Sequence, residues 1–264
     1  VKDNDIHSGQ NEGVYVSENG FGVLSRNRIR NCIGAGVSVA TGGQPDVRDN
    51  QIHGCNRQGV WVQMNGLGMF CDNEIYDNGL AAVDIETEGN ATFLRNNITA
   101  KGTVQAVVVH QHGQGKFEGN EIKGADGKCV EVTASGNPKF TGNTIHGAAL
   151  QGIHVYHAGQ GEFLRNDIFD TSLEAVLIDN NGKPTFDGNT IHHSQGDGIR
   201  VARKGEGIIS NCEIHGNGKS GILIEDSGNP RVRNNRIHDN AANGIHILNM
   251  GRGEMSDNEL YDNE

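Results

Sequence analysis

A glycine recurs every 23 residues along almost the whole of this 264-residue chain, with a single step of 24. A second series, nearly all asparagine, keeps the same spacing and is followed two residues later by isoleucine, or by leucine at the last member. Such strict periodicity indicates one supersecondary unit stacked many times, which excludes most globular folds at once. The glycines are Gly20, Gly43, Gly66, Gly89, Gly113, Gly136, Gly159, Gly182, Gly205, Gly228 and Gly251, and the second series is Asn4, Asn27, Asn50, Asn73, Asn96, Asn120, Asn143, Asn166, Asn189, Cys212, Asn235 and Asn258.

Within each repeat, aliphatic and polar residues alternate over short runs, which is the period of a β-strand. In Gly13-Val14-Tyr15-Val16 and its counterparts, the first and third residues after glycine stay aliphatic while the middle residue varies. We therefore expect the aliphatic side chains to face inward and the variable one to face outward. The N-x-I segment predicts a second strand. A third apolar series contains six consecutive phenylalanines, Phe70 to Phe186, which we expect to stack edgewise or offset.

Three short strands in each repeat, all recurring in the same phase, predict coils rather than hairpins. Equivalent strands would then form three parallel, in-register sheets about 4.8 Å apart per coil. The preference for right-handed crossovers makes this an all-β, right-handed parallel β-helix of about eleven coils. The period excludes a left-handed hexapeptide helix, and the missing leucine spacing excludes a leucine-rich horseshoe.

The two regular series are expected to stabilise the turns. Glycine suits a turn with a positive φ angle. Stacked asparagines can bond to the backbone of their own turn and to the asparagines above and below. Cys212 interrupts the asparagine series, so we expect a locally weaker corner there.

Composition limits the classes of partner and environment. The formal net charge of −11 repels phosphate backbones and anionic membrane surfaces, which excludes nucleic acid and membrane partners. The repeat runs from end to end, so residues 1–264 are read as one β-helix domain, and its start within a repeat suggests a segment of a longer protein. The five cysteines lack CxxC spacing, and as free, buried thiols they favour a reducing, cytoplasmic compartment.

A finer alternation follows the glycine series. Two residues after each of those glycines the chain carries either another glycine or proline, except at Ala91, so the true unit is a coil pair of about 46 residues. Histidine recurs after the N-x-I strand at one phase, which favours a packing role. The paired unit resembles carbohydrate-binding and sugar-hydrolysis repeats, and is most similar to those in the β-helix domain of the F-box protein family. This resemblance implies a recognition surface that binds a protein partner.

The outward positions of one strand series hold a mixture of carboxylates, imidazoles, a phenol and a guanidinium. Such groups are typical of uronate lyases and epimerases, in which an arginine or cation neutralises the sugar carboxylate and a base takes a ring proton. Trp61 adds an exposed aromatic platform for a sugar ring or a protein hot spot. The candidate binding face comprises Trp61, Asp84, Glu86, His110, His112, Glu131, His154, Tyr156, Asp179 and Arg200.

Specific catalytic signatures are missing from this face. The chain has neither the D-P-H-D string of alginate epimerases nor the paired aspartates of polygalacturonases, and Val108 separates Asp84 from Glu131. The strand pair His110-x-His112 lacks a fixed fourth ligand, so we expect no metal and no cofactor.

Three functions are consistent with these patterns. The leading hypothesis is a non-enzymatic recognition or scaffold domain that binds a protein partner along a sheet face. The alternatives are a polysaccharide-binding or polysaccharide-modifying β-helix and a structural spacer. Ala91, Cys212 and a one-residue insertion between Asn96 and Ala106 interrupt the repeat, and two of these lie beside the candidate face.

Overall fold

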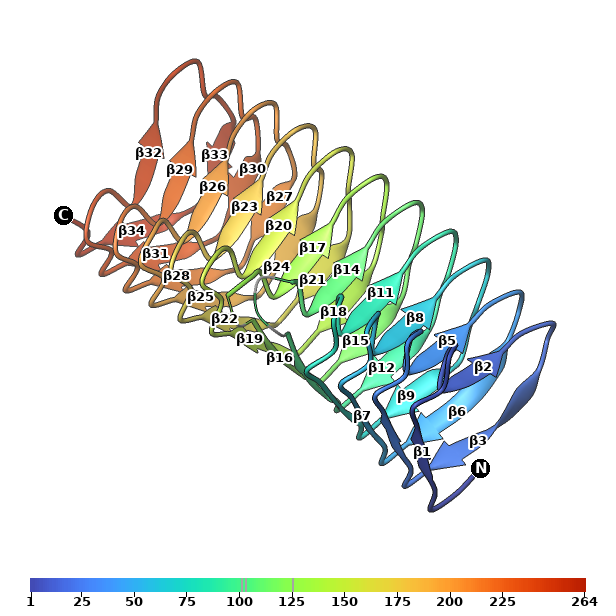
Figure 1. Ribbon diagram of the computed structural model, residues 1–264. Coiled ribbons are helices and arrows are strands. Elements are labelled where there is room, and N and C mark those ends of the chain that lie inside the picture. The colour runs from blue at the N-terminus through green and yellow to red at the C-terminus, as the bar shows by residue number, and fades with distance from the viewer. Residues whose placement is uncertain (101, 103, 125) are drawn as a thin grey trace.

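The chain folds into a parallel β-helix whose coils stack from the N-terminus to the C-terminus along one axis (Figure 1). The computed structural model describes residues 1–100, 102, 104–124 and 126–264. Their strands form three sheets of 12, 11 and 11 strands, and each strand pairs in parallel and in register with its equivalent in the next coil, as Ile52 with Ile75. The predicted parallel, three-sheet architecture is confirmed.

Each coil contributes one short strand to each sheet. The first sheet contains β1 (Asp5–His7), β4 (Arg28–Arg30), β7 (Gln51–His53), β10 (Glu74–Tyr76), β13 (Asn97–Thr99), β16 (Glu121–Lys123), β19 (Thr144–His146), β22 (Asp167–Phe169), β25 (Thr190–His192), β28 (Glu213–His215), β31 (Arg236–His238) and β34 (Glu259–Tyr261). The second sheet contains β2 (Val14–Val16), β5 (Val37–Val39), β8 (Val60–Val62), β11 (Val83–Ile85), β14 (Val107–Val109), β17 (Val130–Val132), β20 (Ile153–Val155), β23 (Val176–Ile178), β26 (Ile199–Val201), β29 (Ile222–Ile224) and β32 (Ile245–Ile247). The third sheet contains β3 (Phe21–Ser25), β6 (Gln44–Arg48), β9 (Met69–Cys71), β12 (Thr92–Leu94), β15 (Lys116–Glu118), β18 (Lys139–Thr141), β21 (Glu162–Leu164), β24 (Thr185–Asp187), β27 (Ile208–Ser210), β30 (Arg231–Arg233) and β33 (Glu254–Ser256).

The core is a narrow column between the three sheets. The inward aliphatic residues of the central coils, such as Val60, Val62 and Ile75, are fully buried, as predicted from their alternation. Phe70 to Phe186 stack face to face, with neighbouring ring centroids 4.4 to 5.2 Å apart and ring planes within 9° of parallel. The edgewise option is therefore wrong, because the strand spacing places equivalent rings directly above one another.

The asparagine series is a hydrogen-bonded ladder. The Asn143 side-chain amide donates to Oδ1 of Asn166 at 2.9 Å and to the carbonyl of Phe117 at 3.0 Å, and its backbone N–H also donates to Asn166 at 2.9 Å. At the interruption, the amide of Asn189 still donates to the carbonyl of Phe163 at 2.8 Å, but toward the next coil it meets the sulfur of Cys212 at 3.8 Å in place of an amide oxygen. A second, unforeseen ladder at another corner joins Asn217, Asn240 and Asn263.

The 23-residue glycine series has a different cause from the one expected. Its members do not have positive φ angles; the two residues before each of them do, as at Met64 and Asn65 before Gly66. A Cβ atom on Gly66 would lie 2.4 Å from the carbonyl oxygen of Val39 in the preceding coil. Close approach of backbone between coils therefore requires glycine, and the positive-φ explanation is wrong.

The outward histidines form a stacked column on the first sheet. His146, Phe169, His192, His215, His238 and Tyr261 stack with ring centroids 4.7 to 5.1 Å apart. Their predicted packing role is confirmed. All five cysteines are buried and free. No helix among the described residues is long and apolar enough to cross a membrane.

Replacement of a glycine of the 23-residue series should disrupt the stacking of coils. Gly66→Ala places a methyl group against a backbone oxygen that cannot move alone, and we expect a loss of about 2–4 kcal/mol in unfolding free energy. Gly22→Ala is the matched control, because its Cβ would meet no atom within 4 Å. Thermal or urea unfolding of both variants measures the difference. Equal stability would contradict the close-approach explanation.

The asparagine ladder can be repaired and broken in matched variants. Cys212→Asn should restore the N–H···O contacts at the interrupted corner and raise the unfolding free energy by about 1 kcal/mol. Asn143→Cys creates the same interruption elsewhere and should lower it by about 1–3 kcal/mol. Denaturant unfolding measures both, and destabilisation by Cys212→Asn would show that Cys212 is not a weak point.

Candidate functional site

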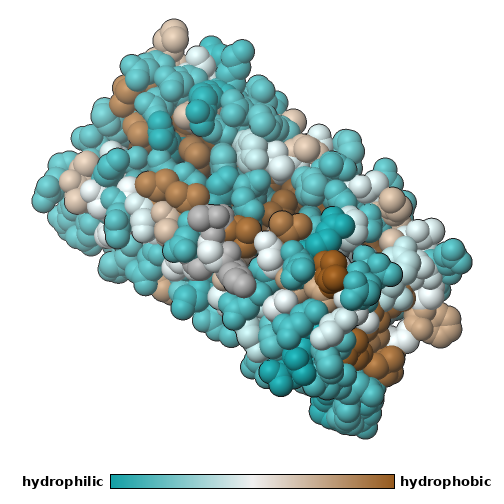
Figure 2. All heavy atoms as spheres, viewed as in Figure 1, coloured by the Kyte–Doolittle hydropathy of each residue, from teal (hydrophilic) through white to brown (hydrophobic). Residues whose placement is uncertain are grey.

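The candidate site lies on the outer surface of the second sheet and along the residues that flank its strands. We call this surface the site face. Its outward side chains form three hydrogen-bonded groups along the axis: the N-terminal, central and C-terminal clusters. Figure 2 shows hydrophobic side chains along the middle of the visible side of the molecule, with hydrophilic side chains around them.

The N-terminal cluster gathers around Asp84. Its residues are Gln58, Trp61, Asp84, Glu86 and His110. The amide of Gln58 donates to Asp84 Oδ2 at 2.8 Å, and Nε2 of His110 lies 3.1 Å from Asp84 Oδ1 and 3.5 Å from Glu86 Oε2. The hydrogen bond with Asp84 raises the pKa of His110 above its ordinary value, in opposition to burial.

Trp61 is not the freely exposed platform that the sequence suggests. Its indole N–H donates to Glu86 at 3.1 Å, and the Arg57 guanidinium lies 5.0 Å from the ring centroid. The residue is half-buried. One face of the ring is thus used within the protein itself.

The central cluster is the most densely connected part of the site face. It consists of Lys128, Glu131, His154, Tyr156, Asp179 and Arg203. The Lys128 ammonium lies 2.6 Å from Glu131 and 2.9 Å from Nδ1 of His154. The other ring nitrogen, Nε2, lies 3.1 Å from Asp179, whose carboxylate also pairs with Arg203.

These contacts select one tautomer of a neutral His154. An ammonium can only donate, so Nδ1 of a neutral His154 accepts from Lys128, and Nε2 carries the proton toward Asp179. Asp179 is fully buried, and burial alone would raise its pKa, but the contacts from His154 and Arg203 lower the pKa below its ordinary value. The imidazole is therefore held in one tautomer, with both nitrogens engaged.

Tyr156 stacks on His154 and acts as a hydrogen-bond donor in this arrangement. The ring centroids are 4.3 Å apart, and the phenol donates to Glu131 Oε1 at 2.9 Å. Burial and the Glu131 carboxylate raise the pKa of Tyr156 to about 12. Burial would raise the pKa of Glu131, but Lys128 and Tyr156 bring that pKa below its ordinary value. At neutral pH the cluster thus holds a neutral phenol beside an ionised carboxylate.

The C-terminal cluster joins Gln151, Glu174, Arg200 and Glu225. The Arg200 guanidinium donates to Glu174 at 3.0 Å and to Glu225 at 2.8 Å. Burial lowers the pKa of Arg200, but the two carboxylates raise the pKa by more than burial lowers it, so the net shift is upward. The expectation of an arginine free to neutralise a sugar carboxylate is wrong, because Arg200 already lies between two carboxylates.

Most predicted site residues share the site face, but His112 does not lie with them. β14 ends at Val109, and His112 sits in the following turn with a φ angle of 62°, so the expected strand pair with His110 is wrong. It lines a separate hollow with Glu88 and Asn90. Val108 does separate Asp84 from Glu131 in the register of the sheet, as predicted. The insertion lies between Ile98, which pairs 23 residues back with Ile75, and Val107, which pairs 24 residues back with Val83, and residues 101 and 103 of this stretch lie outside the described part.

The sequence reasoning missed the residues that flank the strands. Gln58, Gln105, Lys128, Gln151 and Glu174 all lie two residues before a strand of the second sheet. Most of the hydrogen-bonded pairs join residues 25 or 26 apart, as in Trp61 with Glu86 and Lys128 with His154. Such a spacing links one coil diagonally to the next. A search for complementary charges at this offset would have found them.

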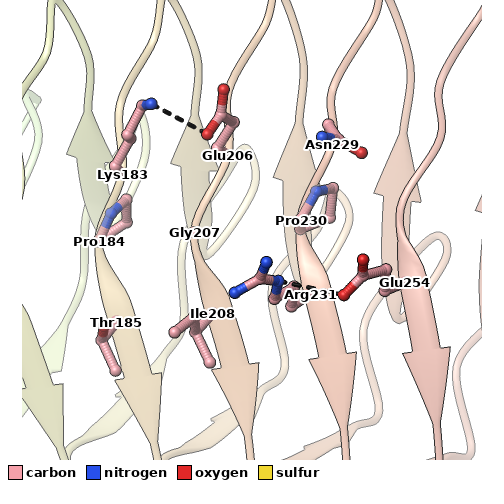
Figure 3. Close-up of a pocket in the computed structure, with 10 residues that line it drawn as sticks. All are labelled: Lys183, Pro184, Thr185, Glu206, Gly207, Ile208, Asn229, Pro230, Arg231 and Glu254. Carbon is pink, nitrogen blue, oxygen red and sulfur yellow. Dashed lines mark ion pairs between the residues drawn. The ribbon is translucent and has the colours of Figure 1, made fainter.

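A second concave surface lies outside the site face (Figure 3). Gly207 has no side chain between Pro184 and Pro230, which leaves a groove of about 320 Å³. Its rim carries the ion pairs Lys183–Glu206 at 3.0 Å and Arg231–Glu254 at 3.1 Å, all between substantially exposed side chains. Exposed pairs of this kind contribute little. Among the described residues, no three His, Cys, Asp or Glu side chains form a set that could hold a metal ion.

The family model described as "Right handed beta helix region" matches residues 1–145 and 128–264. The chain belongs to the right-handed β-helix family. The match also confirms the predicted handedness. No curated protein sequence matches the chain.

Solved structures with the same fold include enzymes that act on alginate. The A-module of Azotobacter vinelandii mannuronan C-5 epimerase AlgE4 has a TM-score of 0.59 and 16% identity over 99% of this chain and 85% of its own. The AlgE6 A-module of that organism has a TM-score of 0.58 and 16% identity over 92% of this chain and 88% of its own. The periplasmic alginate epimerase AlgG has a TM-score of 0.55 and 11% identity over 90% of this chain and 61% of its own. At these identities the likeness establishes a shared fold.

The raised pKa of His110 predicts a specific dependence of stability on pH. Since the folded-state pKa lies above the unfolded value of 6.5, the stabilisation is fully present below pH 6.5 and is lost as the pH rises through the folded pKa. The Asp84→Asn variant should therefore be less stable than the parent by about 1 kcal/mol near pH 6, with a smaller deficit near pH 9. Urea unfolding across this range measures the change.

Asp46→Asn provides the control for this titration. Asp46 pairs with Arg48, which stays charged throughout, so its effect should not vary over the same range. A deficit in Asp84→Asn that is constant with pH, or that grows as the pH rises, would contradict the assignment.

Proposed function

We propose that the site face binds a polysaccharide. The central cluster carries this proposal, because it gathers an imidazole, a phenol, two carboxylates and two cations into one network at the surface of a long sheet. Sugar hydroxyls donate and accept hydrogen bonds, and these groups offer partners of both kinds. The alginate epimerases of the same fold support a polysaccharide ligand.

The form of the face also suits an extended polymer. The three clusters follow one another along the second sheet from the coil of Gln58 to that of Glu225. Successive coils advance by about 4.8 Å, so a chain of sugars laid along the axis would meet a new set of polar groups at every coil. A compact ligand would use only one cluster.

Binding of a polysaccharide requires no rearrangement of the central cluster, whereas catalysis does. For His154 to take a proton from a sugar ring, Lys128 would first have to leave Nδ1, because that lone pair is engaged at 2.9 Å. Tyr156 is a donor and not a base at neutral pH. Polysaccharide modification, such as lyase or epimerase chemistry on uronates, is therefore an additional step that depends on this displacement.

Recognition of a protein partner is the second candidate function. Leu80, Leu150 and Leu173 each lie three residues before a strand of the second sheet and are 42%, 37% and 40% exposed. They border the site face with exposed apolar side chains, and exposed apolar groups among polar residues can mark a protein interface. The resemblance of the repeats to those of F-box proteins points the same way.

Binding to a panel of polysaccharides tests the proposal. The panel should include neutral glucans, polyuronates and amino-sugar polymers, with affinity electrophoresis as the measurement. His154→Ala with Tyr156→Phe should weaken binding at least about tenfold, because it removes both aromatic donors of the central cluster. His246→Ala is the matched control, since His246 occupies the position of His154 in a coil outside the clusters and is exposed.

Two outcomes would count against polysaccharide binding. One is the absence of binding to every polymer in the panel. The other is binding that the central-cluster variant leaves intact and His246→Ala reduces. If Leu80→Ser with Leu173→Ser instead abolishes capture of a defined protein partner, the protein-recognition function replaces the proposal.

A further inference from the structure

We propose that the site face selects a linear polysaccharide that carries primary ammonium groups, an amino-sugar polymer, and discriminates against polyuronates. This inference rests on the proposed polysaccharide function and narrows its ligand class. It depends on which charges of the face are already paired and on one buried acceptor that has no donor.

The cations of the central and C-terminal clusters are all engaged by carboxylates. Lys128 pairs with Glu131, Arg203 pairs with Asp179, and Arg200 bridges Glu174 and Glu225. A uronate that sought one of these cations would have to displace a protein carboxylate, which would then remain beside the ligand anion. Arg57 is a further cation beside the face, and it lies over the Trp61 ring.

In the N-terminal cluster, the carboxylates outnumber the groups that can carry a positive charge. Asp84 and Glu86 face one ionisable partner, His110, so two carboxylates remain against at most one positive charge. The chain as a whole carries a formal charge of −11, which adds to the attraction for a cation. A ligand ammonium would supply the missing charge at this position.

Gln58 supplies the second observation. The residue is only 5% exposed, and its Nε2 donates to Asp84 while its Oε1 is buried and has no hydrogen-bond partner among the described residues. Because both atoms belong to one amide, the orphan oxygen lies beside the Asp84 contact. A buried acceptor without a donor is unusual and points to an absent donor group. An ammonium has three N–H donors, which suits two carboxylates and an amide oxygen.

Further carboxylates lie on the site face along the axis of the β-helix, where a bound polymer would extend. Glu131, Glu174 and Glu225 lie on successive parts of the same face, each beside a protein cation. These pairs are neutral or acidic and so tolerate further ammonium groups better than they tolerate further anions. The N-terminal cluster is therefore the anchoring position, and the remainder of the face tolerates the charge of the chain.

Calorimetry with matched oligosaccharides tests the selectivity on the full chain. The probes are a β-1,4-linked glucosamine hexamer, its N-acetylated counterpart of equal length, and a mannuronate hexamer. The glucosamine hexamer should bind at least about tenfold more tightly than the acetylated hexamer, and the mannuronate hexamer should bind most weakly. Added salt should weaken glucosamine binding, because the attraction is between charges.

The anchoring position is tested with two double variants that change the net charge of the protein by the same amount. Asp84→Asn with Glu86→Gln should lower affinity for the glucosamine hexamer at least about tenfold. Glu206→Gln with Glu254→Gln changes the net charge equally at the exposed groove of the third sheet and should alter the affinity less than about twofold. If the first double variant does not fold, as judged by circular dichroism, Glu86→Gln alone is used.

Each result separates this inference from the polysaccharide proposal. Tighter binding of the mannuronate hexamer, or equal binding of the glucosamine and acetylated hexamers, overturns ammonium selectivity but leaves polysaccharide binding standing. Loss of affinity only in the groove variant overturns the N-terminal cluster as the anchor. Failure of all three hexamers and of the wider panel overturns both.

Discussion

In-register stacking of coils is the constraint on which the rest of the molecule depends. Two contacts maintain it. One is the asparagine ladder, in which each central side chain bonds to the next coil and to backbone, and the other is the close approach of the 23-residue glycine series, from Gly43 onward, to a carbonyl of the preceding coil. A slip by one residue would turn every side chain to the opposite face. Because the register is fixed, outward residues of successive coils are brought into contact as reliably as the core residues are.

The site face is a consequence of that register. Most of its hydrogen bonds run diagonally, from one coil to a position two or three residues farther along in the next, as from His154 to Asp179. Carboxylates and cations at this offset neutralise one another, so the face holds many charges but few that are available to a ligand. Because of this arrangement, we propose a different ligand for residue types that, in the sequence, resemble a uronate site.

Periodicity allowed most of the fold to be predicted from the sequence. The strands, the inward aliphatic residues, the asparagine ladder and the packing of the outward histidines follow from residue types at fixed phases, because each phase meets the same environment in every coil. The role of glycine at Gly66 was mistaken because its cause is a contact with another coil and not its own φ angle. Lys128 and Glu174 were missed because they lie before the strands, and Arg200 was misjudged because charge pairing depends on where long side chains extend.

The central claim is that the charges of the site face are paired within the protein. Burial alone would raise the pKa values of Glu131 and Asp179, whereas pairing lowers them. The most direct measurement is an NMR titration of the side-chain carboxyl carbons of these two residues. The account predicts that both pKa values lie below the ordinary values of 4.5 and 3.8. Values above these would show that the carboxylates are buried without their partners and would contradict the account.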